Sequence, residues 1–158
     1  MARVAPDIKK GDNPFNLKNI KYPLEREILL MEYLDHCTKL SSYIRSERIS
    51  IGKIMSAIKQ VLIAVKMAQK HCDFTHYDLH SSNVMMKKCD PDMVMLYVFE
   101  EDKFLVPTNG SYPVIIDYGF SYANTLDNNY LWPNMCHTHA GMISCKFDKF
   151  ADVKLFLV

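Results

Sequence analysis

THYDLHSSNV, residues 75–84, places two histidines, an aspartate and an asparagine within eight positions of an otherwise apolar region. These side chains, His76, Asp78, His80 and Asn83, follow a long amphipathic segment. From the residues alone, three interpretations are open: a turn whose polar groups satisfy the backbone, a metal site, or a catalytic loop. The metal site is the weakest of these, because no glutamate follows His76 and the neighbouring Asn and Ser favour a loop.

The size and composition are those of one globular domain. Of the 158 residues, 49% are hydrophobic and 23% are charged, which is a balance typical of soluble folded proteins. The net charge of +1 gives no reason to expect nucleic acid or a membrane surface as a partner. Five scattered cysteines without a CxxC pair, and an N-terminus without a secretory apolar core, predict a cytoplasmic protein with reduced thiols.

The chain before the loop predicts one short strand and two helices. Residues 1–26 are polar and proline-containing, which indicates an irregular segment. EILLMEYL, residues 27–34, predicts a buried strand, and residues 38–45 predict a short helix. Ser50 is placed to cap a helix that ends near residue 70. The apolar face of that helix is predicted to comprise Ile51, Ile54, Met55, Ile58, Leu62, Val65 and Ala68.

After the loop, the hydrophobic period changes to that of strands. VMMKK (84–88) and MVMLYVFE (93–100) each predict a strand. KFLVPT (103–108) and SYPVIID (111–117) are predicted to be two arms of a hairpin joined by the turn-forming pair Asn109–Gly110. Residues 121–147 have no period, and the final residues predict the start of an apolar helix.

A cluster within the aperiodic stretch consists of Cys136, His137, His139 and Cys145. Its spacing matches no standard zinc finger, so a polar loop is the preferred interpretation.

A second polar site follows the strand-like residues 114–116. Asp117 stands at the end of this run, and Gly119 comes two residues later. A glycine lets the backbone turn sharply while the carboxylate reaches out of the sheet. Phosphoryl transfer needs such a carboxylate and an amide oxygen to hold Mg²⁺ against the phosphates, together with a second carboxylate that orients the acceptor hydroxyl.

The two sites together resemble the protein-kinase-like superfamily. H-Y-D-L-H-S-S-N resembles the catalytic loop H-x-D-L-x-x-x-N, and D-Y-G resembles D-F-G. The resemblance implies that Asp78 is the catalytic base, that Asn83 and Asp117 are Mg²⁺ ligands, and that ATP is the phosphate donor. It also implies that His76 supports the loop.

The resemblance extends to the residues that would hold adenine. ILLMEYLD (28–35) is similar to the family's hinge, with Met31 as gatekeeper and with the backbones of Glu32 and Leu34 bonded to the base. By the same resemblance, Met85 would form the floor beneath adenine and Ile116 would line the back of the site.

The implied fold is α+β: a mainly helical kinase-like C-terminal lobe over residues 27–158, preceded by the irregular segment 1–26. It has a hinge strand and an enlarged β-hairpin between the catalytic loop and DYG. Asp152 resembles the buried aspartate that opens a later helix and braces the catalytic loop.

The sequence also departs from the family pattern. No glycine-rich loop or supported strand lysine precedes the hinge, and the 26 residues before Glu27 are too few for an N-terminal lobe. We therefore expect a truncated core: a fragment, a truncated gene or a degenerate relative, without its substrate-binding helices.

Two further departures concern the loop and the insert after it. Tyr77 replaces the usual arginine, and His80 replaces the lysine of serine/threonine kinases, which makes D-L-H similar to aminoglycoside and choline kinase-like enzymes. The long connection between Asn83 and Asp117 is similar to kinase-like proteins of large DNA viruses.

Three functions are compatible with these observations. The first is a phosphotransferase that moves the γ-phosphate of ATP to a hydroxyl of a Ser/Thr protein, with Mg²⁺. The second is a kinase whose acceptor is a small molecule, and the third is a non-catalytic module that binds nucleotide or protein. For the isolated chain we expect weak, Mg²⁺-dependent ATP binding and no measurable transfer unless an N-terminal lobe is supplied.

Overall fold

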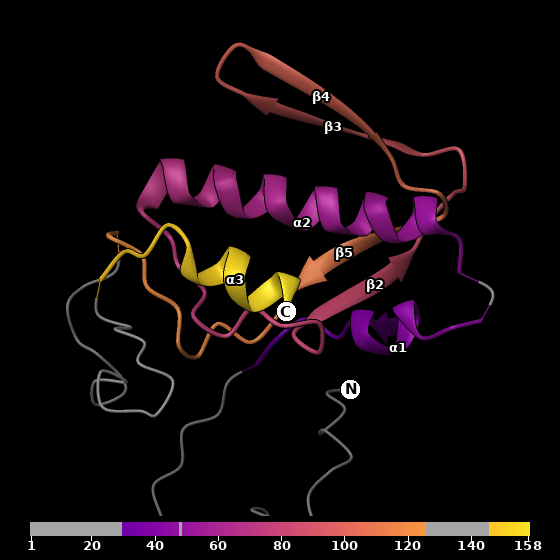
Figure 1. The fold of residues 1–158 in the computed structure, drawn as a ribbon, viewed down its shortest axis with the longest axis horizontal. Coiled ribbons are helices and arrows are strands. Elements are labelled where there is room, and N and C mark those ends of the chain that lie inside the picture. Colours follow the sequence, from indigo (N-terminus) through magenta and orange to yellow (C-terminus); the bar gives the residue numbers. More distant parts are fainter. Residues whose placement is uncertain (1–29, 48, 126–145) are drawn as a thin grey trace, which may run out of the picture. The chain divides into compact units, whose positions relative to one another are not determined.

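The computed structural model describes residues 30–47, 49–125 and 146–158 and has a mixed α/β fold (Figure 1). The chain divides into two units, 1–33 and 34–158, and the helices and strands of the described residues all lie in the second. These elements are β1 (Cys37–Lys39), α1 (Leu40–Ile44), α2 (Ile51–Cys72), β2 (Val84–Lys88), β3 (Val94–Phe99), β4 (Asp102–Pro107), β5 (Ser111–Ile115) and α3 (Ala151–Leu157). Across the described ranges, no helix has the length and apolar character needed to span a bilayer.

The strand predicted over 27–34 is wrong for the part that is described. Residues 30–34 form neither helix nor strand, and the first strand, β1, begins only at Cys37. A short apolar run without a period gives no strand signal beyond its composition, and here the edge of β2 is paired by residues 37–39.

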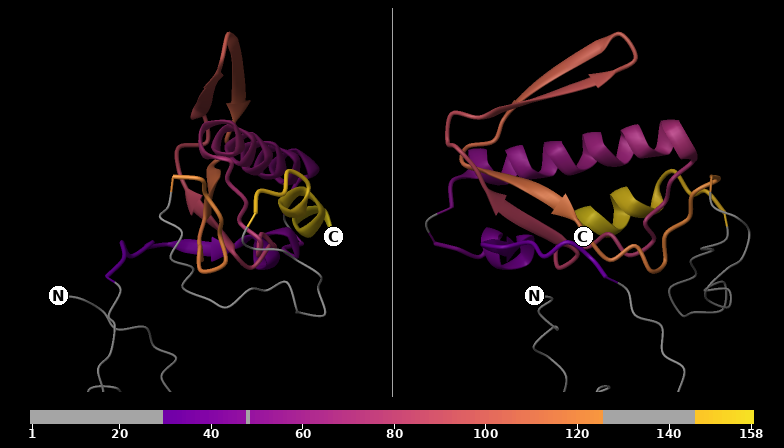
Figure 2. Two further views of the ribbon diagram at one scale, coloured as in Figure 1. Left: turned by 90° about the vertical axis from the view of Figure 1, so that its left-hand side faces the viewer. Right: turned by 180° about the vertical axis from the view of Figure 1, so that it is seen from behind.

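Two antiparallel sheets flank α2. The first has the strand order β1-β2-β5, with Lys39 opposite Met85 and Val84 opposite Ile115. The second consists of β3 and β4 alone. Seen from all three directions, the long helix lies between the hairpin and the three-stranded sheet (Figures 1 and 2).

The sequence predicts α2 correctly at both ends. Ser50 is the N-cap, and its hydroxyl accepts a hydrogen bond of 3.4 Å from the Lys53 amide. The helix ends at Cys72, where Asp73 takes a left-handed conformation with φ of 47°. The apolar core of the domain packs between this helix and the sheet, and its buried members are Leu40, Ala57, Val61, Val65, Leu79, Val84 and Met86.

The predicted buried face of α2 is correct only in part. Val65 is buried in the core, and Ile54, Ile58, Leu62 and Ala68 are half-buried, but Ile51 and Met55 are exposed. The buried positions are Ser56, Ala57, Gln60, Val61, Val65 and Gln69.

Hydrogen bonds to the hairpin explain this difference. The Ser56 hydroxyl donates to the Pro107 carbonyl at 2.5 Å, and the Tyr97 hydroxyl donates to Gln60 Oε1 at 3.2 Å. Polar residues can be buried when such partners satisfy them, so the buried face includes positions that hydropathy alone places at the surface.

The predicted hairpin between residues 103–108 and 111–117 is also wrong. β4 pairs with β3, whereas β5 pairs with β2. Asn109 and Gly110 do have positive φ values of 53° and 89°, as the turn requires, but this turn leads from one sheet to the other. The observed hairpin turns at Glu100, with φ of 56°, where the sequence has no Asn-Gly signal.

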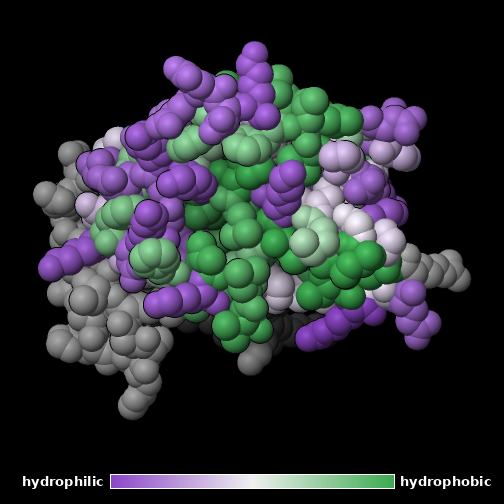
Figure 3. Space-filling model, turned by 45° about the horizontal axis from the view of Figure 1, so that its top comes forward, coloured by the Kyte–Doolittle hydropathy of each residue, from purple (hydrophilic) through white to green (hydrophobic). Residues whose placement is uncertain are grey.

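The hairpin is apolar on both of its faces. Its inner face contacts α2, whereas Val94, Leu96, Val98 and Leu105 are exposed on the outer face. Hydrophobic side chains reach the surface on the side of the molecule where the hairpin lies (Figure 3).

The remaining predictions lie at the C-terminal end. The final helix, α3, begins at Ala151 as expected. The cysteine and histidine cluster at 136–145 lies outside the described residues.

Candidate functional site

The loop after α2 lies against the segment that follows Asp117. Thr75 and Tyr122 form an antiparallel bridge, with N–H to carbonyl distances of 2.9 and 2.7 Å. The Thr75 hydroxyl also accepts from the Asp148 amide at 2.9 Å, which ties the loop to the segment before α3. Nothing in the local sequence distinguishes Thr75 from a surface threonine, so sequence reasoning missed its role.

A buried carboxylate supports the start of the loop 75–84. Asp152 is fully buried and accepts from the His76 amide at 2.8 and 3.0 Å and from the Tyr77 amide at 3.0 Å. Burial raises the pKa of Asp152, and the backbone N–H donors of His76 and Tyr77 oppose that rise. The prediction that Asp152 braces this loop is confirmed. Tyr77, with a left-handed φ of 63°, is buried and donates its hydroxyl to the Lys146 carbonyl.

His76 joins the loop to the residue before Asp117. Its Nδ1 accepts from the Asp78 amide at 3.3 Å, so we assign the ring proton to Nε2, which donates to the Ile116 carbonyl at 3.0 Å. The ring also lies 5.3 Å from that of Tyr118, centroid to centroid. His76 is therefore a buried support for the loop, as predicted.

Asp78 and Asn83 are in direct contact. The side-chain nitrogen of Asn83 donates to Asp78 Oδ2 at 2.8 Å and to the Asp78 carbonyl at 2.9 Å. Both amide protons are therefore committed, whereas the amide oxygen of Asn83 makes no hydrogen bond within the described ranges. Asn83 is nearly buried and Asp78 half-buried. His80 Nε2 lies 3.5 Å from Asp78 Oδ1.

Asp117 reaches the same end of the sheet through the backbone. The Ile116 amide donates to the Asn83 carbonyl at 2.9 Å, so Asp117 directly follows the residue bonded to Asn83. Asp117 has a left-handed φ of 66° and an exposed side chain. A Cβ at Gly119 would lie 3.5 Å from Asp117 Oδ1, in ordinary contact. That Asn83 and Asp117 bind one metal ion stays a prediction.

For the residues proposed to hold adenine, the structure gives their burial and their positions in the fold. Met85 is half-buried and opposite Val114 on the sheet face away from the buried Val84 and Met86. Ile116, immediately after β5, is half-buried. Leu34 is half-buried and lies outside regular structure, before β1, and Glu32 belongs to the first unit of the chain. Their contacts with adenine stay predictions.

Few of the described side chains near the loop could bind a metal ion. In the described part of the chain, no three His, Cys, Asp or Glu side chains form a group that could hold a metal ion. The donor set that remains at the loop is one amide oxygen and one exposed carboxylate, Asn83 and Asp117. Hard oxygen donors of this kind suit Mg²⁺, which usually takes one or two carboxylates, with waters and phosphate oxygens as its other ligands.

Comparisons with known proteins link the chain to viruses of one group. It is 42% identical over 107 residues to "Uncharacterized protein 098R" of Invertebrate iridescent virus 6, which covers 66% of this chain and 18% of that protein. It is 31% identical over 151 residues to "Uncharacterized protein 038R" of Invertebrate iridescent virus 3, covering 93% of this chain and 27% of that protein.

A third relative has a name that bears on function. The chain is 30% identical over 105 residues to "Probable kinase 098L" of Invertebrate iridescent virus 3, covering 61% of this chain and 18% of that protein. No family model matches the chain. The chain therefore spans about a fifth to a quarter of the length of these three relatives, and its homology to a protein named as a kinase is distant and partial.

Proposed function

We propose that this chain carries the phosphotransfer site of a kinase-like protein that moves the γ-phosphate of ATP to a hydroxyl group, with Mg²⁺. One observation carries the proposal: the Asn83 amide nitrogen is bonded to the Asp78 carboxylate at 2.8 Å, while the Asn83 amide oxygen stays available. The distant relative named as a kinase supports the same assignment.

Asp78 is the proposed catalytic base. One carboxylate oxygen is held by Asn83, and the other lies near His80. A carboxylate held in this way can accept a hydrogen bond from the acceptor hydroxyl and take up its proton when the oxygen attacks phosphorus. The buried supports, His76 and Asp152, keep the loop backbone in position for this role.

Asn83 and Asp117 are the proposed ligands of Mg²⁺, through one amide oxygen and one carboxylate. A bound Mg²⁺ would neutralise negative charge on the phosphates of ATP. The adenine would contact Met85 and Ile116 on the sheet side, with the Leu34 backbone supplying a hydrogen bond. A hydroxyl of a serine or threonine protein is the proposed acceptor.

Calorimetric titration with ATP, with and without Mg²⁺, tests the metal role. We expect the 158-residue chain to bind weakly, in the high micromolar range or worse (roughly −5 kcal/mol), and only with Mg²⁺. Asp117→Asn should lose most of this Mg²⁺-dependent binding. Asp102→Asn, an exposed carboxylate on β4, is the matched control and should bind as wild type does. Equal affinity of wild type and Asp117→Asn would remove the metal role from Asp117.

A radiolabelled phosphate assay tests the reaction. The chain contains no glycine-rich loop, and each missing charge-stabilising group typically costs about 100-fold to 1,000-fold in rate. We therefore expect binding without measurable transfer from these 158 residues, and transfer when a nucleotide-covering lobe is supplied. In that larger protein, Asp78→Asn should abolish transfer while ATP affinity is retained.

The acceptor is tested in the same assay. Label in a Ser/Thr protein substrate supports the proposal, whereas label transferred only to a small-molecule alcohol would favour the small-molecule enzyme. ATP binding that is insensitive to Mg²⁺ and to Asp117→Asn would favour a non-catalytic binding module.

A further inference from the structure

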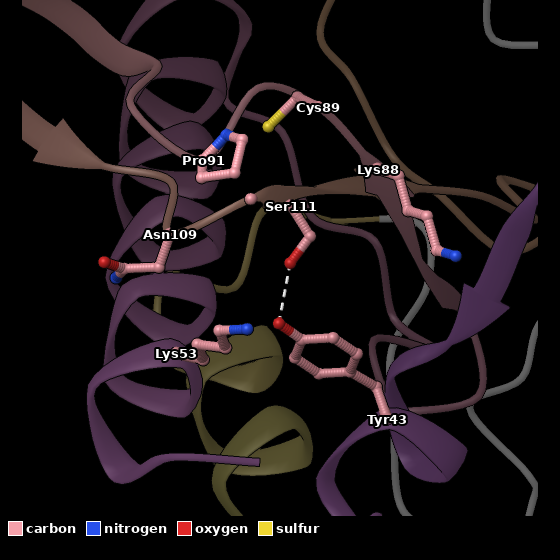
Figure 4. A pocket seen from close by; sticks show the side chains of 8 residues that line it. Tyr43, Lys53, Lys88, Cys89, Pro91, Asn109 and Ser111 are labelled. Carbon is pink, nitrogen blue, oxygen red and sulfur yellow. Dashed lines mark hydrogen bonds between the residues drawn. The ribbon is translucent and has the colours of Figure 1, made fainter. Parts of the chain in front are cut away.

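A pocket lies at the end of β2 opposite the candidate active site. Its lining comes from α1, the first turn of α2, the end of β2 and the turn before β5, and the residues are Tyr43, Lys53, Lys88, Cys89, Pro91, Asn109, Gly110 and Ser111 (Figure 4). Lys88 is the last residue of β2, whereas Asn83 directly precedes the first. Four residue steps of strand, about 13 Å, separate Val84 from Lys88.

The wall of this pocket is held by backbone and side-chain bonds. The Cys89 amide donates to the Gly110 carbonyl at 3.1 Å, and the Gly110 amide donates to the Thr108 hydroxyl at 3.3 Å. Gly110 has φ of 89°, a conformation that strains any residue with a side chain. The turn between the two sheets thus fixes one wall of the pocket.

The charged groups of the lining are all cationic. Lys53 and Lys88 come from different elements, and the lining contains no carboxylate (Figure 4). Among residues 30–47, 49–125 and 146–158, the ion pairs are His36–Asp35, Lys70–Glu100 and His80–Asp78, so neither lysine of the pocket is paired there. Lys53 extends toward the Tyr43 and Ser111 hydroxyls, whereas Lys88 extends away from them (Figure 4). Two ammonium groups without an ion-pair partner at one pocket favour an anion, which Lys88 would reach by a change of rotamer.

A hydroxyl pair adds a neutral donor to these cations. The Tyr43 and Ser111 hydroxyls are 2.6 Å apart, and either can donate to the other (Figure 4). Two hydroxyls have two protons, and their mutual bond uses one of them. The second proton has no acceptor within the described residues and is available to a ligand in the pocket.

We propose that this pocket binds a phosphate monoester dianion. Two ammonium groups and one O–H donor match a group with about −1.5 to −2 charges and three acceptor oxygens better than they match a carboxylate with one charge. The cavity volume of about 530 Å³ leaves room for the organic part of the ester beside the phosphate. This site is separate from the proposed ATP site and does not depend on it.

Titration of the 158-residue chain with O-phosphoserine, followed by backbone amide chemical shifts, tests the proposal. Saturable shifts are expected at Gly110 and Ser111, without shifts at Asn83 and Ile116. Serine and acetate should cause no saturable shift. Saturable shifts confined to Asn83 and Ile116, or no saturable shift at Gly110 and Ser111, would overturn the proposal.

Variants identify the cations. Lys53→Ala and Lys88→Ala should each weaken O-phosphoserine binding about tenfold, because each removes one charge-assisted hydrogen bond. Lys59→Ala, an exposed lysine of α2 outside the pocket, is the matched control and should bind as wild type does. Thermal unfolding checks that all three variants fold. Equal affinity in wild type and the two pocket variants, or an equal loss in Lys59→Ala, would overturn the proposal.

The source of the phosphate is distinguished by inorganic phosphate and by a phosphoserine peptide. Tighter binding of the peptide than of O-phosphoserine would identify a phosphorylated polypeptide as the ligand class, and equal binding would identify a small ester. Binding of inorganic phosphate as tight as that of both esters would overturn the ester part of the proposal.

Discussion

At the Val84 end of β2 the buried polar side chains make hydrogen bonds within the chain, whereas at the Lys88 end two lysines have no ion-pair partner among the described residues. Asn83, His76 and Asp152 each bond to a backbone or side-chain group there, and all three are buried or nearly so. Lys53 and Lys88 at the opposite end have no ion-pair partner in the described ranges and line an open pocket. One strand therefore connects two proposed sites whose polar groups are bonded to different extents.

The difference indicates different demands on the two ends. A group that takes part in a reaction has to be held in one geometry before the substrate arrives, so its supports are buried and fully bonded. A binding pocket for an anion needs charge more than fixed geometry, because flexible lysines can adjust to the ligand. Mutations that remove supports should therefore be costly at the Val84 end and mild at the Lys88 end.

The largest loss of stability is expected from a charge placed on the buried face of α2. Val61 is buried in the core between α2 and the sheet, so Val61→Asp would bury an unpaired charge and lower the free energy of unfolding by roughly 5 kcal/mol or more. Urea denaturation should find this variant largely unfolded.

Ile58→Asp is the comparison for Val61→Asp. Sequence periodicity alone predicts that Ile58 and Leu62 are buried, yet both are half-buried, so a loss of only roughly 1–2 kcal/mol is expected for either. Equal destabilisation by Val61→Asp and Ile58→Asp would contradict the observed orientation of α2.

Removing the buried carboxylate of Asp152 should destabilise the loop at the Val84 end of β2. Asp152→Ala leaves the His76 and Tyr77 amides without their acceptor and should lower the free energy of unfolding by roughly 2–5 kcal/mol. Chemical denaturation measures the loss. Asp152→Asn retains one oxygen acceptor and should be less destabilised than Asp152→Ala; the reverse order would argue against the amide contacts.

The same carboxyl should make stability depend on pH. Burial raises the pKa of Asp152 above its ordinary 3.8, so the folded chain holds this proton more tightly than the unfolded chain does. Its stabilising contribution is complete below that ordinary value and is lost as pH rises through the raised pKa. Measured from about pH 3 to about pH 7, the unfolding free energy of wild type should fall relative to that of Asp152→Asn, which cannot titrate there. A constant difference would exclude this linkage.

The smallest effect is expected at the Lys88 end. Tyr43→Phe removes one hydroxyl of the pair and leaves the buried Ser111 hydroxyl without its partner, which should cost about 1 kcal/mol. Thermal unfolding measures it. Tyr112→Phe is the control, since the Tyr112 hydroxyl makes no hydrogen bond in the described part of the chain. If Tyr43→Phe lost as much stability as Asp152→Ala, the two ends of β2 would not differ in their sensitivity to mutation.

Much of the local structure could be predicted from the sequence. The capped helix from Ser50, the strand VMMKK, the strand within 93–100 and the start of the final helix all depend on periodicity and capping, which neighbouring residues carry. At the site, the spacing of Asp78 and Asn83 and the candidate Asp152 were also visible, because a motif is a local pattern.

Only the tertiary structure decided which strands pair and which face of α2 is buried. Asn109–Gly110 predicts a turn, but whether β5 then pairs with β4 or with β2 depends on the strand edges available elsewhere in the fold. Likewise, Ser56 and Gln60 are buried because β3 and β4 supply their hydrogen-bond partners. The physical reason is the range of the interactions: turns, caps and periods arise between near neighbours in the chain, whereas pairing and burial depend on residues far apart in sequence.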